Sequence, residues 1–491
     1  MNLPTEIYSV ASVRSIDQAA INDAGIGGYA LMMRAGEAAV TAALDAYPGT
    51  KRWQVICGTG NNGGDGYVVA RLAAEREIAV SVISVSSPAN LTGDAAKAYM
   101  DFAALGGESA EFAGTLDIDA ELLFDGLLGS GLERPVEGRF AELVNAMNDH
   151  PASVVALDIP SGIHGDTGAV MGAAVSADLT VTFVGLKSGL FLASGPDHTG
   201  TLRYCDLAIP DDCRRTEEPI LRRIDDDSVH KLLLPRPRNA HKGDFGHVLV
   251  VGGGPGMPGA VTLCGEAALR SGAGLVTIAT HPSHSTLIPI SRPELMCHGI
   301  ETPGDLEPLV DKATVVVIGP GLGTDSWAES LLAIVLASDR PVVADADALS
   351  LIAKGGQPGR HWILTPHPGE AARLLGTKAS DVQAQRRKTL VALSAKYGGT
   401  IVLKGAGTLV SSASGAPWLC SSGNPGMASP GMGDALAGII AAFLAQGLGD
   451  ETAAVAGVQI HAAAGDRAAI SGERGMIASD LIAQIRQQVN K

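Results

Sequence analysis

Aromatic residues are scarce in this chain, at 4% of 491 residues, although apolar residues together make up 46%. Its core must therefore be built mainly from Ala, Val, Leu and Ile, which is typical of parallel strands covered by helices. Charged residues are 18% of the chain, and this balance excludes an intrinsically disordered protein. Because one hydrophobic core rarely serves so long a chain, we expect roughly two to four domains.

Basic patches, paired cysteines and long apolar runs are also missing. The net charge is −16, which argues against nucleic acid as a partner because backbone binding needs a basic surface. The six cysteines form no CxxC pair and no zinc-like spacing, so we expect reduced thiols. No apolar run reaches the roughly 18 residues that span a bilayer, and no secretory signal pattern opens the sequence. We therefore expect a cytoplasmic protein with no membrane partner.

Strand and helix patterns alternate along most of the chain, which predicts α/β domains with doubly wound parallel sheets. A charged stretch at residues 211–227 and the prolines that follow it interrupt the alternation. We place the domain break within 211–228, between a first domain over 1–218 and a second over 225–491. Expected strands are 53–57, 78–85, 122–124, 153–157 and 179–183, then 247–251, 275–280, 314–318, 341–344, 362–364 and 401–403, with closing helices near 433–446, 452–469 and 477–489.

The stretch Gly58–Gly66 reads GTGNNGGDG between a predicted strand and a predicted helix. Glycines let backbone N–H groups approach an anion, and the dipole of the following helix adds to the attraction. The stretch also satisfies GxGxxG, but the acid that a dehydrogenase carries about 20 residues later is absent from Ser84–Pro88. The pattern favours an anion-binding loop over a simple dehydrogenase, with a tight turn and helix cap as the structural alternative.

Two further acids follow predicted strands. Asp125 lies in FDGLLGSGLERP, and Asp158 precedes Ile159-Pro-Ser-Gly, a turn that fixes its carboxylate. The carboxyl ends of parallel strands share one edge of a sheet, where ligands bind. One such Asp alone is more often a cap, but together with Asp65 these acids favour a shared site.

These motifs resemble the NAD(P)H-hydrate epimerase family over nearly all of residues 1–215. The combination of GNNGGDG with DIPSG is specific. The resemblance implies a Rossmann-like domain in which Asp158 is the acid/base and Asn62, Asp125 and Ser161 hold a potassium ion. Implied substrate contacts are Asn61, Asn62, Gly63, Gly64, Asp65, Gly129, Ser130, Gly131, Leu132, Glu133, Arg134, Pro135 and Asp158. Met33 departs from the polar residue expected there. Further similar stretches are Leu31–Gly36, Phe124–Pro135 and Ala177–Lys187.

Four stretches of the second half combine flexible loops with polar side chains. Gly252–Gly256 is an anion loop or only a turn. His367, held between two prolines, is equally consistent with a ligand contact and a structural role. Lys404–Thr408 offers a cation and a flexible loop to a phosphate. Asp434, in GMGD, places a carboxylate beside a helix N-terminus, unless it serves only as a helix-end charge.

No G-K-[ST] occurs, which excludes a P-loop NTPase. GMGD at a helix start instead resembles the ribokinase-like superfamily, in which the Asp takes the proton from the hydroxyl being phosphorylated. With its other motifs, about residues 228–491 resemble the ADP-dependent NAD(P)H-hydrate dehydratases. The resemblance implies Asp434 as catalytic base, a magnesium ion and ADP. Implied substrate contacts are Ala260, Gly321, Gly323, His367 and Asp434, and implied nucleotide contacts are Lys404, Gly405, Ala406, Gly407, Thr408 and Gly433. Pro430 replaces the usual Gly and stiffens the preceding loop.

Together the two resemblances imply an enzyme that repairs hydrated NADH and NADPH (NADHX and NADPHX). The first domain would epimerise the R and S hydrates, and the second would dehydrate the S hydrate while ADP becomes AMP and phosphate. Two alternatives stay open: a ribokinase-like small-molecule kinase with an N-terminal dinucleotide-binding accessory domain, and a first domain that only binds or regulates. Ala/Gly-rich sheet edges also lead us to expect a homo-oligomer.

Overall fold

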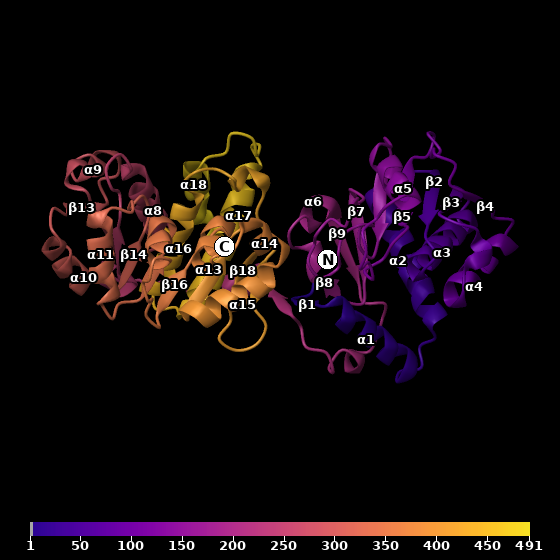
Figure 1. Ribbon diagram of the computed structural model, residues 1–491, viewed down its shortest axis with the longest axis horizontal. Helices are drawn as coiled ribbons and strands as arrows, with labels where there is room; N and C mark the ends of the chain where they lie inside the picture. The colour runs from indigo at the N-terminus through magenta and orange to yellow at the C-terminus, as the bar shows by residue number, and fades with distance from the viewer. Residues whose placement is uncertain (1–2) are drawn as a thin grey trace. The chain divides into compact units, whose positions relative to one another are not determined.

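A computed structural model describes residues 3–491, and the chain divides after Leu221 into two compact units (Figure 1). Unit 1 runs to Leu221 and unit 2 covers Arg222–Lys491. Each unit has a largely parallel sheet between layers of helices, so the predicted α/β class is confirmed. The division lies inside the charged stretch of the sequence, where few apolar side chains can join a core.

The sheet of unit 1 has seven strands in the order β4-β3-β2-β5-β6-β7-β9, and neighbouring strands are parallel. The chain moves from β2 out to β4 and then returns to β5 on the other side of β2. Ligands of open α/β sheets bind at such a reversal, beyond the carboxyl ends of the strands. The strands are β2 Arg52–Cys57, β3 Ala79–Ser84, β4 Ser109–Glu111, β5 Leu122–Gly126, β6 Ser153–Leu157, β7 Leu179–Phe183 and β9 Thr201–Cys205.

Side chains of these strands alternate between two cores, one on each face. Phe124 packs with Trp53 under α2 and α3, and their ring centroids are 4.9 Å apart. Leu123 faces the other way and packs with Leu143 and Met147 of α5. The helices are α1 Val10–Asn22, α2 Gly28–Ala46, α3 Asn61–Glu75, α4 Gly93–Ala104, α5 Arg139–Asn148 and α6 Gly195–Thr199, and two short strands, β1 Glu6–Tyr8 and β8 Leu186–Lys187, pair with each other.

In unit 2, parallel strands run in the order β13-β12-β11-β14-β15-β16-β17. Antiparallel β18 and β19 follow, and β10 pairs with β19. The order reverses between β11 and β14, which marks a second switch point. The strands are β10 Leu221–Arg223, β11 His247–Val251, β12 Leu275–Thr280, β13 Met296–Gly299, β14 Val315–Ile318, β15 Val342–Ala344, β16 Trp362–Leu364, β17 Thr400–Leu403, β18 Thr408–Val410 and β19 Trp418–Cys420.

Helices α8, α16, α17 and α18 share one apolar core with this sheet (Figure 1). Helix α16 is buried along almost its whole length, which explains why its sequence is apolar on every side. The helices are α7 Asp226–His230, α8 Pro258–Arg270, α9 Ile288–Ser291, α10 Glu307–Lys312, α11 Ser326–Leu336, α12 Ala346–Ile352, α13 Pro368–Leu375, α14 Ala379–Ala384, α15 Arg386–Tyr397, α16 Met432–Ala445, α17 Asp450–Ala469 and α18 Ala478–Gln488.

The structure differs from the sequence-based expectation at the sheet margins and in the first glycine stretch. Short strands such as β4 and β13 were not predicted, because their residues are half-exposed and lack a strong apolar pattern. The stretch Gly58–Gly66 is not a loop throughout, since α3 already begins at Asn61. Asn62 to Gly66 therefore lie within the first turns of a helix.

Because each unit has its own sheet and core, we expect the chain to survive a cut between them. Separate expression of residues 1–218 and 219–491 keeps β10 with its partner β19. Both fragments should be soluble and unfold cooperatively in calorimetry. If both were molten while the intact chain folded, each core would depend on the other.

Candidate active sites

The glycines after β2 allow close packing at the switch point of unit 1. A methyl group on Gly58 would lie 1.9 Å from the carbonyl oxygen of Leu127, and one on Gly63 would lie 2.1 Å from that of Gly58. Any larger residue would therefore push α3 away from β2 and from the loop that follows β5. Gly60, the N-cap residue of α3, offers no side chain to the first-turn N–H groups. These groups can face an anion.

Asn62, Asp125 and Ser161 meet beside this helix start. Ser161 donates its backbone N–H to Oδ2 of Asp125 at 2.7 Å and its hydroxyl to Oδ1 at 2.5 Å. Asn62 donates its side-chain N–H to the carbonyl oxygen of Leu128 at 3.0 Å. The three residues that the resemblance assigns to potassium are thus brought together from α3, β5 and the loop after β6.

The oxygens of this cluster fit a monovalent cation. Oδ1 of Asn62 is buried and accepts no hydrogen bond within the described chain. Asp125 is fully buried, and no Lys, Arg or His of residues 3–491 forms an ion pair with it. Burial raises the pKa of Asp125 to about 6, against the lowering effect of the Ser161 and Leu127 hydrogen bonds. An unpaired carboxylate beside an orphaned amide oxygen is a donor set suited to a hard cation.

Asp158 adopts a left-handed backbone conformation, with φ of +67°, at the turn after β6. This conformation costs a non-glycine residue about 1–3 kcal/mol and often marks a functional site. Its Oδ1 accepts a hydrogen bond from Lys187, which also donates to Oγ1 of Thr182 at 3.0 Å and to the carbonyl oxygen of Phe183 at 2.9 Å. Lys187 is 1% exposed, so its charge is committed to this pair. Lys187 ends the stretch Ala177–Lys187 that resembles the epimerase family, but no role was predicted for it, because one lysine at the end of a short strand carries no local signal.

The loop Gly129–Pro135, also predicted to contact substrate, has both buried and exposed residues. Leu132 is buried and joins the core beneath α5, while Glu133, Arg134 and Pro135 are exposed. Gly129 lies against Asn62, since a methyl group on it would be 3.3 Å from Cβ of Asn62. Asp65 is close to Asp158, because burial and then the charge of Asp158 raise the pKa of Asp65 well above its ordinary value.

In unit 2, several charged residues surround the start of α16. Nζ of Lys404 lies 2.6 Å from Oδ1 of Asp345 and 3.8 Å from Oε2 of Glu370. A methyl group on Gly433 would lie 3.1 Å from Nζ of Lys404. Burial raises the pKa of Asp434 to about 7, with the charge of Asp345 adding to the shift and that of Lys404 opposing it. Asp434 can therefore accept a proton near neutral pH.

Lys404 was predicted to offer a cation to a phosphate, and in the structure its ammonium is paired with Asp345. Burial lowers its pKa, but the charges of Asp345 and Glu370 more than compensate, so its pKa is raised overall. Asp345 is 1% exposed and was missed in the sequence, although it directly follows the predicted strand β15. The rule that found Asp125 and Asp158 would have found it.

The remaining predicted residues of unit 2 lie at the same edge of the sheet. The N–H of Gly254 donates to the carbonyl oxygen of Gly321 at 2.6 Å, and a methyl group on Gly321 would be 3.1 Å from Cβ of Ala260. Gly323 donates to Oδ2 of Asp347 at 2.8 Å. His367 caps α13, and its ring nitrogen Nε2 lies 3.4 Å from Oε1 of Glu370.

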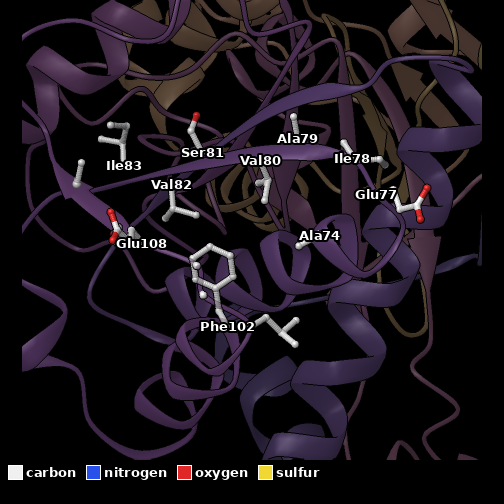
Figure 2. Close-up of a pocket in the computed structure, with 15 residues that line it drawn as sticks. Ala74, Glu77, Ile78, Ala79, Val80, Ser81, Val82, Ile83, Phe102 and Glu108 are labelled. Carbon is white, nitrogen blue, oxygen red and sulfur yellow. The ribbon is translucent and has the colours of Figure 1, made fainter.

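One hollow of unit 1 is lined by none of these site residues. It has a volume of about 860 Å³ and runs along β3, where Ala79 to Ile83 line it together with the ends of α3 and α4 and the start of β4 (Figure 2). Its lining is mainly apolar, and Glu77 and Glu108 are its charged residues. Ligands of open α/β sheets bind beyond the carboxyl ends of the strands, where Asn62, Asp125 and Asp158 lie.

Comparisons with known proteins match both units separately. A family model described as NAD(P)H-hydrate dehydratase matches residues 248–487, and one described as YjeF-related protein N-terminus matches residues 28–189. The bifunctional NAD(P)H-hydrate repair enzyme Nnr of Coxiella burnetii is 47% identical over 487 residues, covering 99% of this chain and 100% of the relative. The chain belongs to the bifunctional NAD(P)H-hydrate repair enzyme family. The enzyme of the same name from Escherichia coli is 41% identical, covering 100% of this chain and 95% of the relative.

A solved structure supports the fold of unit 2. A ribokinase-like superfamily protein from Enterococcus faecalis aligns with a TM-score of 0.52 and 32% identity, covering 55% of this chain and 95% of that protein. The predicted ribokinase-like fold is therefore confirmed. Within residues 3–491, none of the helices has the length and hydrophobicity needed to cross a membrane.

The buried Lys404–Asp345 pair yields a stability prediction. Lys404→Met leaves the Asp345 carboxylate buried without its cation, which should lower the free energy of unfolding by about 3–5 kcal/mol. Lys354→Met is the matched control, because Lys354 forms an exposed pair with Glu329 at 3.4 Å and should cost less than about 1 kcal/mol. Urea denaturation followed by tryptophan fluorescence measures both. Equal losses of unfolding free energy in the two variants would mean that water solvates Asp345.

Proposed function

We propose that unit 1 epimerises the R and S forms of NADHX and NADPHX, and that unit 2 dehydrates the S form with ADP as co-substrate. The observation that carries this proposal is that each switch point has its own aspartate beside a lysine that is paired with a carboxylate. Asp158 with Lys187 and Asp434 with Lys404 are separate centres of proton chemistry. Membership of the repair-enzyme family supplies the substrate class.

Inversion at C6 of the hydrated nicotinamide requires proton transfer at its hydroxyl, because that carbon must lose and regain a bond. Asp158 is the proposed acid/base, held in place by its turn and by Lys187. The start of α3, residues Asn61–Asp65, and the loop Gly129–Pro135 are the proposed contacts of the dinucleotide. The uncapped N–H groups of α3 favour the negative charge of a pyrophosphate.

A potassium ion is the proposed partner of Asn62, Asp125 and Ser161. The orphaned Oδ1 of Asn62 and the unpaired carboxylate of Asp125 support it. A bound cation would supply positive charge next to the helix start. The protein's own contribution is to hold Asp125 with two hydrogen bonds from Ser161 and so fix the loop that carries Asp158.

Dehydration is harder than epimerisation because hydroxide is a poor leaving group. In the proposed reaction, Asp434 takes the proton of the C6 hydroxyl while the hydroxyl oxygen bonds to the β-phosphorus of ADP, and AMP leaves. The lone pair of the ring nitrogen then expels phosphate from C6, and loss of a proton from C5 of the resulting iminium restores the dihydronicotinamide. The first turn of α16 stabilises the transferred phosphoryl group. Ala260, Gly321, Gly323 and His367 are the proposed contacts of the hydrate.

Lys404–Thr408 and Gly433 are the proposed contacts of the nucleotide. Arg386 shapes this loop by donating to the carbonyl oxygens of Leu403, Lys404 and Gly407 at 3.1–3.3 Å. Among residues 3–491, no group of three or more His, Cys, Asp or Glu has the arrangement of a metal site. We therefore propose that magnesium arrives with the phosphates of the nucleotide, as this ion commonly does.

The proposed domains are residues 1–218 for the epimerase and 225–491 for the dehydratase, in a cytoplasmic homo-oligomer. The alternative is a ribokinase-like kinase with an accessory domain. There Asp434 has the same task, but the phosphate stays on the product and is not released. Release of inorganic phosphate in step with NADH formation separates the two readings.

Two substitutions should separate the activities. Asp158→Asn should abolish epimerisation while dehydration of the S hydrate continues, because Asp434 is untouched. Asp434→Asn should lower ADP-dependent dehydration about 10²- to 10⁴-fold while epimerisation continues. Chromatography of the two hydrates and the absorbance of the dihydronicotinamide measure these rates. Each variant is the folding control for the other, and loss of both activities in one variant would contradict independent sites.

The pH dependence of dehydration should follow Asp434. Since its pKa is raised to about 7, the carboxyl is protonated and inactive as a base at lower pH. The kcat/KM for the S hydrate should fall about tenfold per pH unit below 7 and level off above it.

Glu370 provides the control for this profile, because burial also raises its pKa to about 7. Glu370→Gln should keep the inflection, whereas Asp434→Asn should remove it along with most of the rate. An inflection that disappears only in Glu370→Gln would assign the titration to Glu370.

A further inference from the structure

Helix α1 lies at the unit 1 site, yet the proposed mechanism uses none of its residues. The N–H of Val10, its first residue, donates to Oδ1 of Asp166 at 2.8 Å, in the loop that follows Asp158. Val13 and Ile16 pack into the core on one side of the helix. The helix is therefore fixed in position, and Val10, Arg14 and Asp17, spaced four and three residues apart, share a face.

This face lies over the loops proposed to bind the dinucleotide. A methyl group on Gly165 would be 2.4 Å from Cγ2 of Val10, and one on Gly131 would be 2.2 Å from Nη2 of Arg14. The missing side chain of Gly131 thus leaves the space that the guanidinium occupies. Further along the face, burial raises the pKa of Asp17 to about 6. The charge of Lys187 lowers this pKa, and the charge of Asp158 raises it. Asp17 therefore lies within electrostatic range of the proposed catalytic pair.

The guanidinium of Arg14 is an available positive charge at this site. The residue is exposed, and no carboxylate or carbonyl oxygen of residues 3–491 forms a hydrogen bond or ion pair with it. Lys187, in contrast, is fully engaged by Asp158 and its neighbours. Because Lys187 is engaged, an anionic substrate of this site needs another local cation. A guanidinium can hold phosphate oxygens with two parallel hydrogen bonds.

We propose that Arg14 binds a phosphate group of the dinucleotide hydrate across the loop Gly129–Pro135. This rests on the proposed epimerase function of unit 1 and adds to it a binding residue from α1. Two phosphate sources have this chemistry, the pyrophosphate of either hydrate and the 2′-phosphate that only NADPHX carries. Kinetics with both substrates distinguish them.

The test compares Arg14→Gln, Arg14→Lys and Arg203→Gln in the full chain. Each is made in an Asp434→Asn background, so that unit 2 consumes almost no hydrate while the epimers are separated by chromatography. Arg14→Gln should raise KM about 10-fold and leave kcat nearly unchanged, because a charged hydrogen bond to substrate is lost. Arg14→Lys should recover most of the affinity. The exposed Arg203, on β9, also forms no hydrogen bond or ion pair within residues 3–491 and should tolerate its substitution.

Kinetics with NADHX and with NADPHX identify which phosphate group Arg14 contacts. A higher KM for both hydrates supports contact with the pyrophosphate, and a higher KM for NADPHX alone supports contact with the 2′-phosphate. Unchanged KM values for both hydrates, or a loss confined to kcat, would overturn the proposal. An unsubstituted chain without any epimerisation would instead reject the proposed function of unit 1.

Gly131→Ala gives an independent measurement of the same contact. The added methyl group must displace the guanidinium, so this variant should raise KM in the same direction as Arg14→Gln. Combined with Arg14→Gln it should add little, because both changes remove one interaction. Fully additive effects would contradict a shared contact.

Discussion

A largely buried ion pair between a lysine and an aspartate underlies the arrangement of both sites. A carboxylate taken out of water is costly unless a cation or hydrogen bonds compensate. Lys187 compensates Asp158 in unit 1, and Lys404 compensates Asp345 in unit 2. Each pair lies where strands of a parallel sheet end, so the charges converge at the edge that also receives the ligand.

The two pairs leave different acids ready for chemistry. In unit 1 the paired acid itself faces the site, and its left-handed backbone holds it there at a conformational cost that its hydrogen bonds help to offset. In unit 2 the lysine satisfies Asp345, and the neighbouring Asp434 is left partly desolvated with a pKa near neutrality. One unit thus offers an oriented ion pair, and the other offers a base tuned by burial.

Close backbone approach is the second constraint that the units share. In unit 1, Gly58 and Gly63 let α3 start directly against β2 and the loop after β5. In unit 2, the N–H groups of Gly253 and Gly254 donate to the carbonyl oxygens of Pro320 and Gly321, which joins the two loops of the switch point. Both arrangements place helix starts and glycine loops, beside the single cations Arg14 in unit 1 and Lys404 in unit 2, where the phosphates of a dinucleotide or nucleotide are proposed to bind. This accounts for anion binding by a chain with a net charge of −16.

Local pattern in the sequence determined the fold class, the central strands and the acids that follow them. The strands Ser153–Leu157, Leu179–Phe183 and His247–Val251 have the predicted bounds, because short runs of β-branched and apolar residues mark buried strands in the sequence. Only the tertiary structure decided that α3 starts at Asn61, that Lys187 meets Asp158, and that Arg14 lies over Gly131. These facts depend on residues distant in the chain that come together when sheets and helices pack. A short-range pattern records which residues are buried or capped, but it carries no information on which distant side chain will compensate a buried charge.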